Sequence, residues 1–279
     1  MQINQSHEIG EVAAAGANTP MTVRGGKMPI WIMDTTQLST NFALLATRAE
    51  QKVCVRIAGG CAGMTDADKA EMADYFANAF QGYRGMIWSG GTRQVTQDGR
   101  IDMMVTEIPA IVAAANPGAL ALGTAPRTGT FHLAGESRFE LDGGGLRLNP
   151  AMAGVAVVQN GPDGLLGWDG DLDLYFTLMT RLREFAGFTA VGVVAWNGGG
   201  VTASEILRSA RLGWPTIVVK GSGRKADEFA QRLEVADPTL LSELPHGHKL
   251  IVCDRSDPMT LRSALVEHGF VAADKVLAA

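Results

Sequence analysis

The 279-residue sequence lacks any uninterrupted apolar stretch near the roughly 18 residues that would suggest a membrane-spanning helix. Its first 20 residues also lack the basic start and long apolar run of a secretory signal. Cysteine is scarce: Cys54, Cys61 and Cys253 are odd in number and show no metal-binding spacing, which favours reduced thiols. These absences predict a cytoplasmic protein that is not inserted in a membrane and carries no metal centre.

The sequence also lacks a cluster of basic residues. Its formal net charge is −5, from 24 basic and 29 acidic residues, so a nucleic-acid partner is disfavoured. No G-x-x-x-x-G-K-[ST] occurs, which excludes a P-loop, and no G-x-G-x-x-G follows the first strand, which argues against a dinucleotide-binding Rossmann domain. Apolar residues make up 46% and charged residues 19%, values that are typical of a globular protein.

Apolar strands alternate with helix-period segments from residue 52 onward. The run 52–58 predicts a strand, and Thr65 with Asp68 three positions later predicts a capped helix that continues through Phe80. This alternation, with short connections, favours a parallel sheet covered by helices on both faces. The sequence therefore predicts an α/β, Rossmann-like, doubly wound fold. Further strands are expected at 85–88, 119–124, 155–159, 190–196, 216–220 and 249–253, and helices at 103–115, 172–185, 202–212, 225–233 and 258–268.

One domain accounts for the whole pattern, because no internal repeat or low-complexity linker is visible. We expect residues 1–20 to form a flexible arm and residues 21–279 to form a single domain, with its regular core at about 52–235. Residues 41–50 are helix-like. The alternation of strands and helices is interrupted near 128–150, where Arg138–Leu148 predicts a hairpin closed at Asp142–Gly145.

Four predicted strands end in glycine-rich turns. Glycine lets a backbone approach a ligand closely, and the N–H groups of a following helix favour phosphate oxygens. Because the carboxyl ends of parallel strands line the ligand crevice of such sheets, we expect these turns to form one binding site. The expected ligand-binding residues are Gly59, Gly60, Ser89, Gly90, Gly91, Thr92, Asn197, Gly198, Gly199, Gly200, Thr202, Glu205, Gly221, Ser222 and Arg224.

The segment Asn197–Glu205 resembles the P-G-G-x-G-T-x-x-E motif of the LOG nucleotide phosphoribohydrolases. The segment Thr216–Ala230 is similar to part of the N-terminal ligand-sensing region of melastatin-type TRP channels. Both belong to the SLOG superfamily, and the similarity spans about residues 52–235. The chain thus resembles the prokaryotic, sensor-type branch of that superfamily, which implies a Rossmann-like fold.

The resemblance implies a sensor for a nucleotide-derived molecule, such as ADP-ribose, cyclic ADP-ribose or an NAD-related compound. Arg224 would supply charge to the phosphates, and Glu205 would contact a ribose, although a carboxylate there also suits the helix dipole. No cofactor is expected. Because no effector domain is visible, the output would be homo-oligomerisation or a separate effector protein.

A LOG-like nucleoside monophosphate phosphoribohydrolase is the alternative, with Glu205 and Arg181 as the catalytic pair. The chain departs from the LOG pattern in three places. Asn197 replaces the motif proline, Val201 replaces a glycine, and Leu182 stands where the family has an arginine. These departures favour a non-catalytic sensor. A third alternative is an assembly module whose pocket is vestigial.

Several other residues are interpreted without a ligand role. Trp88 and Trp196 precede glycine turns, where they could stack on a base, but such residues more often fill the core. His246 and His248 are interpreted as loop, and the aspartates from Asp169 to Asp173 as a solvated turn, because their spacing fails the EF-hand pattern.

Overall fold

The computed structural model describes residues 21–22, 29–34, 48–126, 131–134, 138–141, 146–159 and 172–273. Several predictions fall elsewhere: the arm at 1–20, most of the helix-like stretch 41–50, and the turn 142–145 of the hairpin lie outside the described residues.

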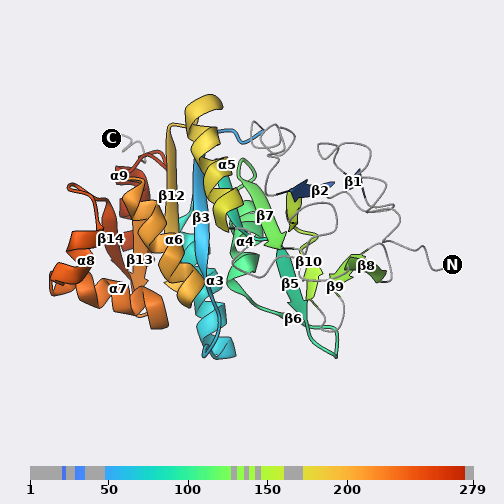
Figure 1. The fold of residues 1–279 in the computed structure, drawn as a ribbon. Coiled ribbons are helices and arrows are strands. Elements are labelled where there is room, and N and C mark those ends of the chain that lie inside the picture. The colour runs from blue at the N-terminus through green and yellow to red at the C-terminus, as the bar shows by residue number, and fades with distance from the viewer. Residues whose placement is uncertain are drawn as a thin grey trace, which may run out of the picture.

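A nine-stranded sheet forms the centre of the described structure (Figure 1). All neighbouring strands run parallel except the first pair, which is antiparallel, and this confirms the predicted α/β, Rossmann-like fold. In spatial order the strands are β1 (Met21–Thr22), β2 (Pro29–Asp34), β11 (Gly154–Gln159), β7 (Leu120–Pro126), β4 (Met86–Gly90), β3 (Val53–Gly60), β12 (Ala190–Asn197), β13 (Thr216–Lys220) and β14 (Leu250–Asp254).

The order of strands reverses in the middle of this sheet. From β3 the chain winds outward through β4, β7 and β11, and it then returns to the other side of β3 with β12, β13 and β14. The carboxyl ends of β3 and β12 therefore flank the switch in strand order, which is where open α/β sheets bind their ligands.

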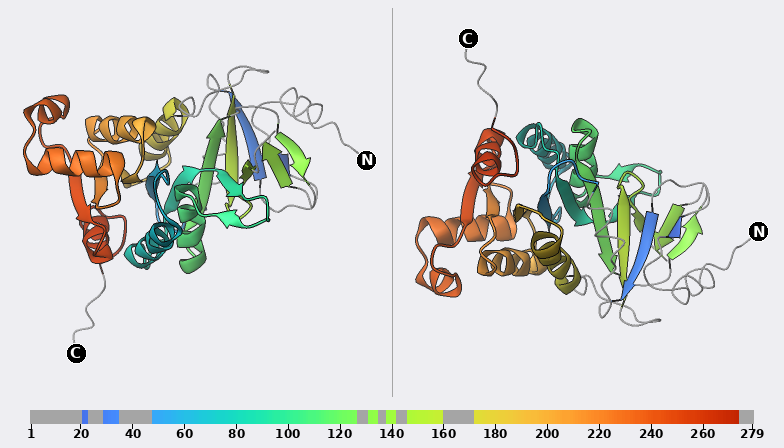
Figure 2. Two further views of the ribbon diagram at one scale, coloured as in Figure 1. Left: turned by 90° about the horizontal axis from the view of Figure 1, so that it is seen from below. Right: turned by 90° about the horizontal axis from the view of Figure 1, so that it is seen from above.

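Helices cover both faces of the sheet (Figure 2). One face packs against α3, α4 and α9, and the other against α5, α6 and α7, as the two buried apolar clusters show. The helices are α3 (Asp66–Ala79), α4 (Ile108–Ala115), α5 (Leu172–Phe185), α6 (Gly200–Arg211), α7 (Arg224–Glu234), α8 (Pro238–Glu243) and α9 (Pro258–Glu267).

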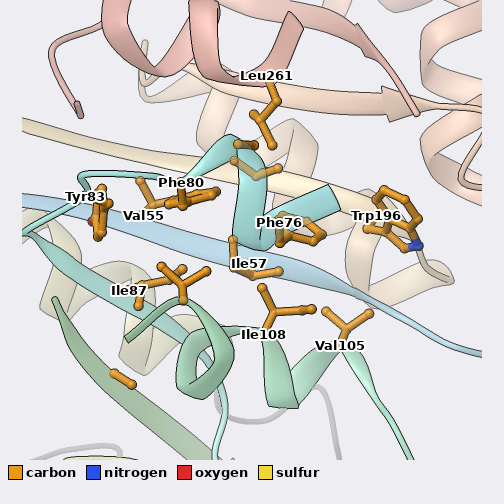
Figure 3. Close-up of a cluster of buried hydrophobic side chains, with 14 of the residues drawn as sticks. Val55, Ile57, Phe76, Phe80, Tyr83, Ile87, Val105, Ile108, Trp196 and Leu261 are labelled. Atoms are coloured by element: carbon orange, nitrogen blue, oxygen red, sulfur yellow. The ribbon is translucent and has the colours of Figure 1, made fainter. Parts of the chain in front are cut away.

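Several aromatic side chains pack among aliphatic ones in the cluster on the α3 face. Phe76 of α3 and Phe80, which follows the end of α3, pack in the same cluster as Ile57 of β3, with Trp196 at one end (Figure 3). The ring of Trp196 lies 5.6 Å from that of Phe76, centroid to centroid. Trp88 packs in the opposite cluster, and both tryptophans are fully buried, so they fill the core as interpreted.

A second, antiparallel sheet follows β4 almost directly. Its strands in order are β6 (Ile101–Asp102), β5 (Thr92–Val95), β10 (Leu146–Leu148), β9 (Arg138–Leu141) and β8 (Phe131–Ala134). The two expected arms of the hairpin, β9 and β10, are adjacent and antiparallel. The expected turn at 89–92 differs from the structure, since Ser89 and Gly90 end β4 and Thr92 begins β5.

Close packing at Gly91 explains this course of the chain. A Cβ atom on Gly91 would lie 2.3 Å from Cγ1 of Val155, and one on Gly123 would lie 2.4 Å from the Cα of Gly91. Only glycine allows β4, β7 and β11 to approach so closely at the point where the chain leaves one sheet for the other. The helix expected from residue 103 starts later, as a 3₁₀ turn at Val105–Glu107 that leads into α4.

Candidate functional site

The loops after β3, β12 and β13 are tied together around Asn197. Its side-chain Nδ2 donates to the carbonyl of Ala62 at 3.2 Å, and its backbone N–H donates to Oγ of Ser222 at 2.8 Å. Asn197 is also paired with Gly60 in the register of β12 and β3. The structure thus brings three of the four predicted glycine turns to the switch in strand order.

Two helices begin at this junction with glycine as their N-cap residue. Gly199 precedes α6 and Gly223 precedes α7, and neither helix has a side-chain cap. In contrast, α3, α8 and α9 are capped by the side chains of Thr65, Asp237 and Asp257. A helix start without a side-chain cap leaves N–H groups and the positive end of the dipole available to an anion.

Arg224 is the first residue of α7, and its side chain reaches the start of α6. A Cβ atom on Gly199 would stand 3.2 Å from Nη2 of Arg224, so the guanidinium rests against the N-cap of α6. The backbone N–H of Lys225 donates to the carbonyl of Gly198 at 3.4 Å, which joins the two loops directly. Arg224 is exposed, so its positive charge is accessible at the junction.

The backbone here holds two non-glycine residues in the left-handed region, Asn197 with φ 53° and Arg224 with φ 44°. Such conformations are uncommon for residues with a side chain and cluster at functional sites. Gly198 has φ 87°, and a Cβ atom there would stand 2.3 Å from Oγ1 of Thr202. Buried Thr202 therefore fills the space behind the loop and supports it.

The remaining residues of the motif lie at the start of α6. Gly200 is exposed and has open space where a Cβ would be. Val201, which replaces a glycine of the motif, belongs to the first turn of α6 and is 38% exposed.

The glycine turns after β3 and β13, which also meet at the junction, have structural constraints of their own. A Cβ atom on Gly59 would stand 2.2 Å from the carbonyl oxygen of Trp196, so β3 and β12 approach closely there. The N–H of Gly221 donates to Oδ1 of Asp227 at 2.6 Å, and the Ser222 hydroxyl donates to the carbonyl of Val219 at 2.5 Å.

The predicted residues 89–92 use their polar groups within the fold. The Ser89 hydroxyl donates to the carbonyl of Ile57 at 3.0 Å, and the N–H of Gly91 donates to the carbonyl of Thr124 at 2.6 Å. Thr92 is buried at the start of β5. Among the described residues, no hydrogen bond or ion pair joins this turn to the starts of α6 and α7, so it stands apart from the Asn197 junction.

Glu205 lies in a buried polar cluster beneath the start of α6. Its Oε1 accepts from Nε of Arg56 at 3.1 Å and from the hydroxyl of Tyr175 at 2.7 Å. The Arg56 guanidinium also lies over the Tyr175 ring, 4.0 Å from its centroid. Glu205 is only 2% exposed, so its carboxylate is committed to this cluster.

Arg56 was not among the residues expected at the site. The available signal was a single arginine inside the otherwise apolar strand 53–58, because a buried charge needs a partner. The arginines expected from α5 behave differently: Arg181 is exposed, and Leu182 between Arg181 and Arg183 is buried in the core.

Arg255, in the turn between β14 and α9, supports the loop after β13. It donates to the carbonyl of Gly221 at 3.2 Å and to the carboxylates of Asp68 and Glu71 on α3, each at 2.6 Å. Hydrogen bonds from Thr65 and then Arg255 hold the pKa of Asp68 well below its usual range, and Arg255 likewise lowers the pKa of Glu71.

Two other features of the described residues do not coincide with the junction. A cavity of about 340 Å³ lies at the opposite edge of the sheet, between the end of α4 and the start of β4, and Glu50, Arg84 and Asn116 are among its lining residues. Within the described ranges, no three histidine, cysteine or acidic side chains gather as a metal site would require. Nor is any described helix both long and apolar enough to cross a bilayer.

Comparisons with known proteins place the chain in a family. The family model described as "SLOG in TRPM, prokaryote" matches residues 52–260. No curated protein matches the chain. Among solved structures, the X-ray structure of TM1055 is 22% identical with a TM-score of 0.36, covering 65% of this chain and 81% of that one.

The molybdenum cofactor carrier protein of Chlamydomonas reinhardtii is 13% identical with a TM-score of 0.44, covering 78% of this chain and 98% of that one. The family match includes β3, the Asn197 junction and Arg224, so the residues that form the candidate site all lie inside it. The chain belongs to the prokaryotic SLOG-in-TRPM family.

Proposed function

We propose that this protein binds a phosphate-bearing, nucleotide-derived small molecule at the Asn197 junction and acts as a sensor of it. ADP-ribose, cyclic ADP-ribose and NAD-related compounds are the proposed ligand class. The phosphates would bind N–H groups at the starts of α6 and α7, apart from the N–H of Lys225, which donates to Gly198, and Arg224 would pair with their negative charge.

The observation that carries this proposal is the contrast between helix starts. Side chains cap α3, α8 and α9, and α4 has no such cap but continues from a 3₁₀ turn, whereas the two helices that begin at the switch in strand order have glycine N-caps. Glycine at these positions leaves room for a ligand where a capping side chain would otherwise stand. The exposed guanidinium of Arg224 against Gly199 adds the charge complementarity that a phosphate requires.

The state of Glu205 favours sensing over N-glycosidic hydrolysis. General acid–base catalysis requires the carboxylate to come within hydrogen-bond distance of the substrate. Here its Oε1 is held by Arg56 and Tyr175, and the side chain is almost completely buried. Arg181, the arginine expected from the LOG pattern, is exposed on α5, and the arginine that contacts Glu205 is instead the buried Arg56. Contact between Glu205 and a ribose is accordingly not part of this proposal.

Isothermal titration calorimetry with ADP-ribose tests the proposal directly. We expect saturable binding by the wild-type protein, and a loss of at least tenfold in affinity for Arg224→Gln, because a charged hydrogen bond contributes about 1.5–3 kcal/mol. The matched control is Arg100→Gln, since Arg100 is an exposed arginine in the β5–β6 turn, where it pairs with Asp98.

Absence of wild-type binding to ADP-ribose and to inorganic pyrophosphate alike would refute the phosphate site. If ADP-ribose does bind, the signal would pass through homo-oligomerisation or a separate effector protein, which sedimentation with and without ADP-ribose distinguishes. A ligand-dependent change in sedimentation supports homo-oligomerisation, and an unchanged monomer with bound ligand supports a separate effector.

A further inference from the structure

Asn197 carries a buried hydrogen-bond acceptor at the centre of the junction. The residue is 2% exposed, and its Nδ2 donates to the carbonyl of Ala62 at 3.2 Å. Because a carbonyl oxygen can only accept, this bond fixes the orientation of the amide and places Oδ1 on the other side. The Oδ1 atom has no hydrogen-bond partner among the residues that the structure describes.

The position of Oδ1 places it next to the proposed phosphate site. A Cβ atom on Gly223, the N-cap of α7, would stand 3.3 Å from Oδ1. Only the glycine hydrogen occupies that space, so the acceptor borders the start of α7. The next two residues along the chain, Gly198 and Gly199, lead into α6.

An amide oxygen in this position has a defined chemical preference. It accepts hydrogen bonds and repels phosphate oxygens, so it cannot bind the phosphate itself. It suits a donor such as a hydroxyl group attached close to the phosphate. A buried acceptor without a partner is uncommon in folded proteins and calls for an explanation, of which a ligand donor is one.

We propose that Asn197 determines ligand specificity, its Oδ1 accepting a hydrogen bond from a sugar hydroxyl adjacent to the bound phosphate. This inference rests on the proposed phosphate site and narrows its ligand class to sugar phosphates and nucleotides with a free hydroxyl near the phosphate. Because the Oδ1 atom is buried beside Gly223, the proposed contact would require a small shift of the Gly221–Arg224 loop. Its backbone has φ 84° at Gly221, 109° at Gly223 and 44° at Arg224.

Two substitutions at this position separate recognition from structure. Asn197→Gly removes the amide, and glycine adopts the required left-handed φ without strain. Asn197→Asp keeps the size of the side chain and keeps an acceptor, while the bond to Ala62 is lost. Asparagine and aspartate both tolerate the left-handed region, so neither requires a different backbone conformation at position 197.

The experiment measures the affinities of ADP-ribose and inorganic pyrophosphate for each protein by isothermal titration calorimetry, with melting curves to verify folding. Pyrophosphate offers charge without a sugar hydroxyl. We expect Asn197→Gly to reduce the ratio of ADP-ribose to pyrophosphate affinity at least tenfold. We expect Asn197→Asp to keep this ratio within about twofold, although repulsion between the new carboxylate and the phosphates lowers the affinity for both ligands.

Each alternative outcome is distinguishable. If Asn197→Gly weakens both ligands equally, or neither, Asn197 has no recognition role and the inference is wrong while the phosphate site stands. The inference is also wrong if wild-type protein binds pyrophosphate as tightly as ADP-ribose. If Asn197→Gly does not fold, a loss of the preference in Asn197→Asp would contradict the inference instead. Failure of wild-type protein to bind either ligand would overturn the phosphate site together with the inference.

Discussion

Arg56 and Glu205 form a buried ion pair between β3 and α6, with Nε 3.1 Å from Oε1, although 149 residues separate them in sequence. Their side chains are 9% and 3% exposed. The Tyr175 hydroxyl completes the cluster from α5. The pair fastens the helix that follows the glycine motif to the central strand, so it fixes where the start of α6 stands.

Removal of one partner of this pair should destabilise the protein strongly. We expect Arg56→Met to reduce the free energy of unfolding by about 3–5 kcal/mol, because Glu205 would be left as a buried charge without its counter-ion. The double substitution Arg56→Met with Glu205→Leu should recover most of that loss. Chemical denaturation followed by circular dichroism measures both. A loss below about 1 kcal/mol for Arg56→Met would show that the pair is dispensable.

Two glycines of the same motif should respond oppositely to alanine. Gly198→Ala should lower the melting temperature, because φ 87° strains a residue with a side chain by about 1–3 kcal/mol and the new Cβ would meet Thr202. Gly200→Ala should be neutral or raise stability by up to about 1 kcal/mol, since this site is helical and has open space. Differential scanning calorimetry of the two variants makes the comparison. Equal effects would contradict the described loop geometry.

The cluster around Arg255 should make stability depend on pH in the acid range. Asp68 and Glu71 have pKa values below their ordinary 3.8 and 4.5, so their contribution is complete above those values and is lost as pH falls through the lower folded pKa values. We expect Arg255→Gln to unfold at lower urea concentration than wild-type protein at pH 7. The gap in urea midpoint should narrow steadily below about pH 4. A gap that is constant with pH would exclude this ionic origin.

The protein should not release a free base from nucleoside monophosphates. Because Glu205 is held by Arg56 and Tyr175, we expect adenosine monophosphate to yield no adenine above the no-protein background, as measured by liquid chromatography. Glu205→Gln serves as the control for contaminating activity. Rapid adenine release by wild-type protein that disappears in Glu205→Gln would establish the hydrolase and refute the sensor.

The amino-acid sequence alone determined the fold class and most elements near the site. Apolar period-two strands and glycine turns specify this architecture locally, and the Thr65 capping box is present as its spacing predicted. The short helix α8 was missed, although Asp237 before Pro238 is a helix-start signal, because its six residues show little periodicity.

Only the tertiary structure decided which residues act together. Glu205 was expected to face a ligand, but the choice between solvent and core depends on whether Arg56 and Tyr175 stand opposite, and no local pattern encodes contacts across 149 and 30 residues. The turn at 89–92 has the same glycine signature as the turn at 197–200. It instead enables strand packing, because Val155 and Gly123 lie against Gly91. A glycine in the sequence indicates a close approach of the backbone to another group. Only the packed fold determines whether that group belongs to a neighbouring strand or to a ligand.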